Sequence, residues 1–173
     1  MAVNARTSSG TLGDLVYDAF YAGGIGGSVV ALFFLALDVW KGQALMTPSL
    51  MGSVLFLGAP AASAADVRLD MVAAYTLVHF AAFGLLGTFV AVAVHELELH
   101  AKHPLIVGLS IFALAELAFY AAAALFMPGV IEVVGAVQIA VANLLAAGGI
   151  GLFLLSSHRP DLWSRVKHAL HVA

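Results

Sequence analysis

Residues 105–126 read LIVGLSIFALAELAFYAAAALF, an apolar stretch whose single charged residue is Glu116. A helix that crosses the hydrocarbon core of a bilayer needs about 20 apolar residues, because it rises about 1.5 Å per residue. In hydrocarbon the backbone must satisfy its own hydrogen bonds, and the stretch lacks the alternation of a barrel strand. It therefore predicts a transmembrane helix.

Three further apolar runs have the same character, at residues 19–40, 71–94 and 130–155. Over the whole chain 62% of the residues are hydrophobic, 10% are charged, and the mean hydropathy is +1.03. A soluble chain of 173 residues needs a polar exterior, which 10 acidic and 7 basic residues could not supply. We therefore expect an all-α integral membrane four-helix bundle that forms a single domain over residues 1–173.

A short extra helix is expected between the first two spans. Thr47 and Pro48 are typical of an N-cap followed by a proline in the first turn, which predicts a helix over about residues 47–58. This helix would be too short to cross the bilayer. It is expected either to be re-entrant or to lie flat against the bundle.

Interfacial helices are expected at both termini. Residues 12–20 carry apolar side chains on one face of a short helix and acidic side chains on the other. A C-terminal helix is expected over about residues 160–171, where Trp163, Val166 and Leu170 form an apolar stripe. This pattern favours a lipid surface anchor over a partner-binding helix.

Charge and cysteine content exclude several classes of function. The net charge of −3 provides no basic surface for nucleic acid, so no nucleic-acid partner is expected. The absence of cysteine excludes disulfides, thiolate metal sites and a cysteine nucleophile.

The positive-inside rule favours both termini in the cytoplasm, because that side would carry Arg6, Lys102, Arg159, Arg165 and Lys167, and the other side only Lys41 and Arg68.

Polar side chains from three spans are expected to form a buried polar layer. Counted along the helices, His79, Glu116 and Gln138 lie about 12–15 Å below the same boundary and Asn143 about 20 Å below it. Tyr75 lies one turn above His79. The layer could be a functional site, either with Glu116 accepting a proton beside His79 or as a pocket for a ligand head group. It could instead be a set of hydrogen bonds that fixes helix register. The hydrogen-bond interpretation is favoured.

No metal site and no cofactor are predicted. A haem held between helices usually needs two axial ligands, and the spans contain one histidine, His79. A di-iron bundle needs Glu-x-x-His pairs on two helices, which the chain lacks. His79 could therefore serve only as a single axial ligand, to a pigment or haem shared with another subunit. The segment from His95 to His103 is expected to be a solvated helix end, because His95 and His100 do not share a helix face.

Small residues predict close approach of helices. Gly23 and Gly27 have the GxxxG spacing in the first span, and Ala147 and Gly151 have it in the fourth. This spacing suits a homodimer face and a contact within the bundle equally well.

The stretch LDVWKGQALMTPSLMGS at residues 37–53, followed by YTLVH at residues 75–79, resembles a group of small bacterial four-span inner-membrane proteins with no known activity. The resemblance covers most of the four-span core. It implies a location in the bacterial inner membrane and implies no catalytic residues.

These observations favour a non-enzymatic function, as a structural or accessory subunit of a larger membrane complex. The expected partners are the lipid bilayer and other membrane subunits or a second copy of the chain. One alternative is a small transporter or channel component that uses Glu116 and His79. A weaker alternative is a pigment- or haem-binding subunit that uses His79.

Overall fold

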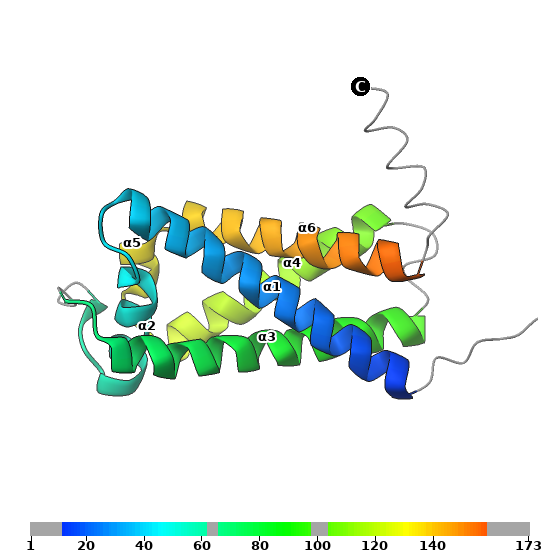
Figure 1. Cartoon of the computed structure of the whole chain (residues 1–173), viewed down its shortest axis with the longest axis horizontal. Helices are drawn as coiled ribbons and strands as arrows, with labels where there is room; N and C mark the ends of the chain where they lie inside the picture. The colour runs from blue at the N-terminus through cyan, green and yellow to red at the C-terminus, as the bar shows by residue number, and fades with distance from the viewer. Residues whose placement is uncertain (1–11, 62–65, 98–103, 159–173) are drawn as a thin grey trace, which may run out of the picture.

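The computed structural model describes residues 12–61, 66–97 and 104–158 (Figure 1). Over these ranges it contains helices and no strand, so the predicted all-α fold is confirmed. The six helices are α1 (Leu12–Trp40), α2 (Met46–Leu57), α3 (Leu69–Leu97), α4 (Pro104–Phe126), α5 (Val130–Val134) and α6 (Ala136–His158).

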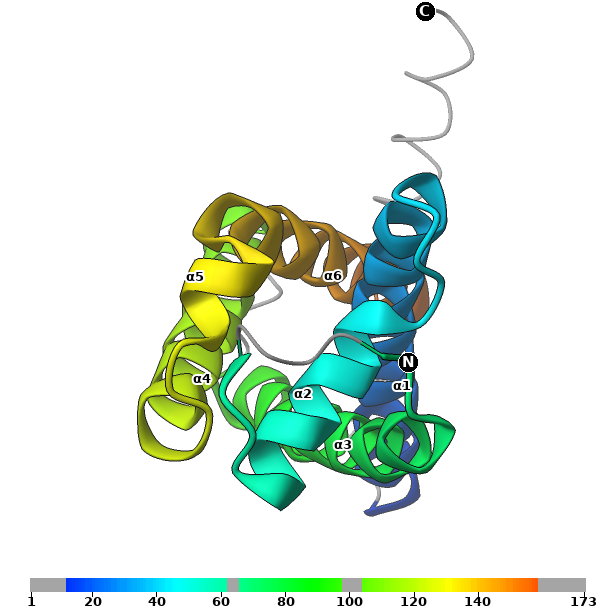
Figure 2. The same ribbon diagram turned by 90° about the vertical axis from the view of Figure 1, so that its left-hand side faces the viewer.

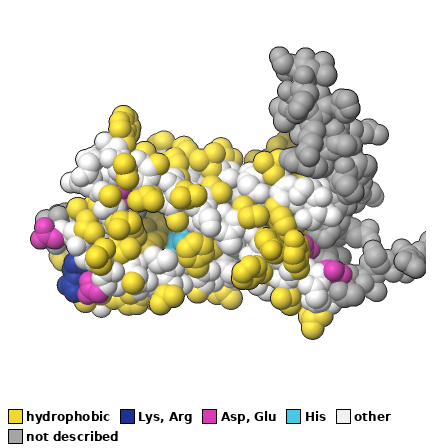
Figure 3. All heavy atoms as spheres, in the orientation of Figure 1, with side chains coloured by type: hydrophobic (Ala, Val, Ile, Leu, Met, Phe, Trp, Pro, Cys, Tyr) yellow, Lys and Arg dark blue, Asp and Glu magenta, His cyan; other side chains and the backbone are white. Residues whose placement is uncertain are grey.

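Four of these helices, α1, α3, α4 and α6, are long and apolar enough to cross a membrane. All four run along the long axis of the molecule (Figure 1). Hydrophobic side chains are spread over the face shown in Figure 3, whereas acidic side chains lie toward both of its ends and basic side chains at one end. The chain is therefore a multi-pass membrane protein.

The first span differs from the prediction at its N-terminal end. Residues 12–20 form the first turns of α1 and not a separate interfacial helix. No proline interrupts the chain from Leu12 to Trp40, and an existing helix gains about one backbone hydrogen bond for each residue added. The interfacial helix predicted over residues 160–171 lies outside the described residues.

The fourth span also differs from the prediction. It is not continuous from residue 130, because Gly135 separates α5 from α6. Gly135 has a φ of 95°, which residues with a β-carbon rarely adopt. The side chain of Gln138 occupies the place where a β-carbon on Gly135 would lie. The break therefore depends on glycine, and α6 alone carries the span.

The four spans pack in the order α3, α1, α6 and α4. Helix α1 packs on α3 and on α6, and α4 packs on α6. Within the described ranges, α3 and α4 make little contact with each other. Seen along the bundle, the four spans form a ring, and α2 lies across the near end (Figure 2). We call this end the α2 end.

Polar contacts hold α2 across the bundle. The backbone N–H and the hydroxyl of Thr47 both donate to the carboxylate of Asp38 near the end of α1, at 2.7 Å each. The backbone N–H of Arg68 donates to the hydroxyl of Ser49, at 2.8 Å. Thr47 is therefore not the N-cap that its sequence context predicts, since the N-cap is Leu45, with a φ of 66°. The helix expected over residues 47–58 is present as α2.

Glycines bring α1 and α3 into backbone contact. A β-carbon on Gly23 would lie 2.6 Å from the carbonyl oxygen of Phe83. A β-carbon on Gly87 would overlap the backbone of Ala19 and of Gly23. Two bulkier residues could not cross at this distance, so the glycines set the separation of the two helices.

The other small residues predicted to mediate packing divide into two groups. Gly27 packs on the ring of Phe80 in α3, so the GxxxG spacing of α1 is used within one chain. Ala147 is buried in the same core cluster as Ala22. A β-carbon on Gly151 would meet no neighbouring atom within 4 Å.

Candidate ligand-binding cavity

A cavity of about 480 Å³ lies between the spans, in the half of the bundle next to α2. Side chains from α1, α2, α3, α4 and α6 line it, and most of them are aliphatic or aromatic. Its volume falls within the range of small-molecule sites, about 300–1,000 Å³. In Figure 3 the surface is hollowed in this half of the molecule, with a histidine side chain at the hollow.

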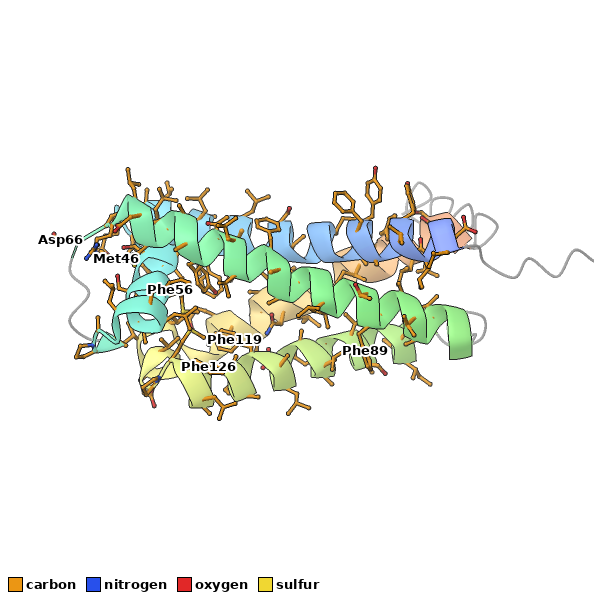
Figure 4. All side chains as sticks on the ribbon, turned by 90° about the horizontal axis from the view of Figure 1, so that it is seen from below. Met46, Phe56, Asp66, Phe89, Phe119 and Phe126 are labelled. Carbon is orange, nitrogen blue, oxygen red and sulfur yellow. The ribbon has the colours of Figure 1, made fainter. Side chains whose placement is uncertain are left out.

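The cavity follows from the way the helices cross. α1 and α3 touch at Gly23 and Gly87 and diverge toward the α2 end (Figure 1). The backbones of α3 and α4 make little contact, so only side chains reach into the space between these two helices. Figure 4 shows Phe119 and Phe126 in this space. These side chains do not fill the volume that the divergence creates.

The cavity is open at the apolar surface of the bundle. Leu32 and Phe126 line it and are also 63% and 61% exposed at the protein surface. Val78 and Phe80 likewise line it and are exposed. In a bilayer these side chains face hydrocarbon, so an apolar molecule can enter the cavity without passing through water.

The lining is uncharged. No aspartate, glutamate, lysine or arginine occurs among the described residues that line it, and five of its side chains carry a hydrogen-bonding group: Thr47, Tyr75, Thr76, His79 and Asn143. An apolar wall with a few polar groups is typical of a site that binds a small molecule. The two threonines are already engaged, Thr47 with Asp38 and Thr76 with the carbonyl of Val72.

His79 is bonded to the neighbouring span. Its Nε2 lies 2.9 Å from the carbonyl oxygen of Gly27. A carbonyl oxygen only accepts, so we assign the proton of the neutral ring to Nε2. The ring packs on Phe83, at 4.9 Å between centroids, and on Tyr75, at 5.8 Å. His79 therefore helps to join α3 to α1 at the cavity wall.

Glu116 is paired with Asn143 and not with His79. The side-chain amide of Asn143 donates to Oε1 of Glu116 at 2.8 Å, which connects α6 to α4. Asn143 is buried and lines the cavity, whereas Glu116 does not line it. The two expected members of one site, Glu116 and His79, thus form separate hydrogen bonds.

The break at Gly135 changes the depth of the polar residues in the fourth span. Gln138 lies in the first turn of α6, about 3 Å along the helix from Ala136, and its amide packs against Gly135. Asn143 lies about 10 Å along the same helix. Asn143 therefore reaches Glu116, and Gln138 stays near the α2 end of the bundle.

Tyr75 lies on the cavity wall one turn from His79. Its ring packs on the imidazole, but its hydroxyl has no hydrogen-bond partner in the part of the chain that the structure describes. Of the five polar side chains of the cavity, Tyr75 is the one that forms no hydrogen bond within the described ranges.

Potential metal ligands are dispersed within the described ranges. The described ranges contain no group of three or more histidine, aspartate or glutamate side chains placed to hold a metal ion. The Nε2 of His79 is engaged by Gly27, so axial ligation through this atom would break that hydrogen bond. Residues 98–103, which include His100 and His103, lie outside the described residues.

Two features of the site were not predicted. One is the contact between Asp38 and Thr47, for which an acidic residue at the end of an apolar run was an available signal. The other is the cavity itself. Its apolar residues would look the same in the sequence if they filled a tightly packed core.

In comparisons with known proteins, no family model, no curated protein and no solved structure matches this chain. The resemblance to small bacterial inner-membrane proteins therefore stays a prediction. The function has to be inferred from the residues of the cavity and their geometry.

Proposed function

We propose that this protein is a non-enzymatic membrane protein that binds a lipid-class molecule in the cavity between its spans. The observation that carries the proposal is the cavity of about 480 Å³, whose described lining residues are uncharged and whose edge includes apolar side chains exposed at the surface. A tightly packed bundle would have no such space, because the interiors of folded proteins contain few voids larger than a water molecule. An apolar molecule from the bilayer would fill it.

Filling the cavity with protein side chain tests this role. Ala115 is buried on the cavity wall, and Ala121 lies exposed on the same helix away from it. We expect the wild-type protein, purified in mild detergent, to retain a lipid-class compound near one molecule per chain. We expect Ala115→Phe to retain at least about tenfold less, because the ring takes up the space. Mass spectrometry of the solvent extract measures both.

The control and a second variant make the test decisive. Ala121→Phe should retain as much of the compound as the wild type. Ala122→Phe, which also alters the cavity wall, replaces Ala115→Phe if the latter does not fold. The proposal would be contradicted if the wild type and the plugging variants, Ala115→Phe and Ala122→Phe, retained equal amounts of the compound. It would also be contradicted if the wild type retained none.

We also propose that the protein acts as an accessory subunit of a larger membrane complex. α4 supports this, because it is the least covered of the four spans and exposes Leu105, Leu117 and Leu125. The same purification from native membranes should then yield a companion chain. A monomer free of other chains would argue for a protein that works alone.

A proton-coupled transport role is the second candidate. The observation in its favour is that Asn143 joins the cavity to Glu116, the one carboxyl group in the middle of α4. Glu116→Gln can still accept the hydrogen bond of Asn143 but cannot release a proton. In proteoliposomes this variant should abolish proton flux driven by an imposed gradient. Flux equal to that of the wild type would remove the candidate.

A further inference from the structure

The polar groups of the cavity are not equally available to a ligand. Four of the five already have partners within the protein. The hydroxyl of Thr47 donates to Asp38, that of Thr76 donates to the carbonyl of Val72, and Nε2 of His79 bonds to the carbonyl of Gly27. The side-chain amide of Asn143 donates to Glu116.

The hydroxyl of Tyr75 is the remaining group. It has no partner within the described ranges, although the ring forms part of the cavity wall. An unpaired hydroxyl in apolar surroundings is unfavourable by about 1–3 kcal/mol, and most such groups in folded proteins have a partner. The partner of Tyr75 is therefore expected to come from the molecule that occupies the cavity.

The charge of the lining limits the chemistry of that molecule. An ionised head group that left water for this cavity would meet no side chain of opposite charge among the described lining residues. Burial of an unpaired ion is far less favourable than burial of a neutral polar group. A neutral molecule is therefore favoured over a fatty acid anion or a phospholipid head group.

The position of Tyr75 sets the orientation of the molecule. Tyr75 lies near the α2 end of the cavity wall, and Leu86 lies further along the same wall of α3. These two positions are eleven residues apart, which corresponds to about 16 Å of helix. Apart from the imidazole of His79, the wall beyond Tyr75 thus offers a long apolar surface that ends near the middle of the bundle.

We propose that Tyr75 donates its hydroxyl hydrogen to the single polar oxygen of a neutral, mostly hydrocarbon lipid, such as a long-chain alcohol, whose tail lies along α3. This inference rests on the proposed function, because it assumes that the cavity is occupied by a lipid-class molecule. It adds the chemical class of the ligand and the residue that selects it.

Three probes of equal chain length test the proposal. Dodecanol carries the neutral oxygen, dodecane lacks it, and dodecanoate replaces it with a charge. Binding of each radiolabelled probe to the full-length protein in detergent can be measured by scintillation proximity. We expect dodecanol to bind more tightly than dodecane, and dodecanoate to bind at least about tenfold more weakly than dodecanol.

Two matched variants assign the effect to Tyr75. Tyr75→Phe keeps the ring and removes the hydroxyl, so it should weaken dodecanol binding by about 3- to 10-fold and leave dodecane binding unchanged. Thr88→Val removes a hydroxyl of α3 that is bonded to the carbonyl of Gly84 and does not line the cavity, so it should change the binding of neither probe. Thermal unfolding checks that both variants are folded.

The outcomes separate this inference from the proposed function. If Tyr75→Phe weakens dodecanol and dodecane equally, or weakens neither, the role of the hydroxyl is wrong although the cavity still binds lipid. Tight binding of dodecanoate would overturn the choice of a neutral ligand. If the wild-type protein binds none of the probes, and the plugging variants lose no native compound, the proposed function itself fails.

Discussion

Gly87→Ala is expected to lower the free energy of unfolding by about 3 kcal/mol, through the addition of one methyl group. The new β-carbon would overlap the backbone of Ala19 and of Gly23 in α1. A flexible side chain could move aside, but backbone atoms in the middle of a helix can shift only if the helix shifts with them. α1 and α3 would therefore separate at their crossing point.

Gly84→Ala is the matched control, because the two glycines lie one turn apart on α3. A β-carbon on Gly84 would meet no neighbouring atom within 4 Å. The free energy of unfolding of Gly84→Ala should therefore stay within about 1 kcal/mol of the wild-type value, since alanine favours a helix more than glycine does. Unfolding in a mixed-detergent titration compares the two variants. Equal stability of Gly87→Ala and Gly84→Ala would show that the helices do not meet as closely as the structure places them.

Asn143→Leu is expected to destabilise the protein by about 1–3 kcal/mol, because it removes the donor that satisfies Glu116. The carboxyl group would remain on α4 without the hydrogen bond from α6. Hydrogen bonds between transmembrane helices contribute only about 0.6–2 kcal/mol, so most of the loss would come from the unsatisfied group that remains.

A double-mutant cycle separates these two contributions. The variant with Glu116→Leu and Asn143→Leu should recover most of the lost stability, because replacing both partners leaves no polar group unpaired. Glu116→Gln should be close to the wild type, because its carbonyl oxygen still accepts the bond. If the two single substitutions to leucine are additive in the double variant, Glu116 and Asn143 do not interact.

Much of the fold could be predicted because transmembrane character is a local property. The run from residue 105 to residue 126 is apolar whatever lies beside it, and α4 occupies almost the same residues. The short α2 was also predicted within one residue at each end. The continuous α1 and the break at Gly135 were not predicted. The first depends on the continuation of a helix that nothing interrupts, and the second on the positive φ that Gly135 adopts.

The candidate site could be predicted only in part. The sequence singles out Tyr75, His79, Glu116 and Asn143 because polar groups in hydrocarbon require partners. Counting along straight helices did not identify those partners. The break at Gly135 moves Asn143 to the level of Glu116, and the close crossing of α1 and α3 places His79 beside Gly27.

The sequence by itself therefore determined the class of protein, the four spans and the polar residues that need partners. Hydropathy and length establish these features, and both can be summed along a single segment. The tertiary structure alone decided which groups pair and where the bundle leaves a cavity. It also decided that the hydroxyl of Tyr75, on the cavity wall, has no hydrogen-bond partner within the described ranges. These features depend on distances between segments far apart in the chain, which are set by the crossing of α1 and α3 and by the turn at Gly135.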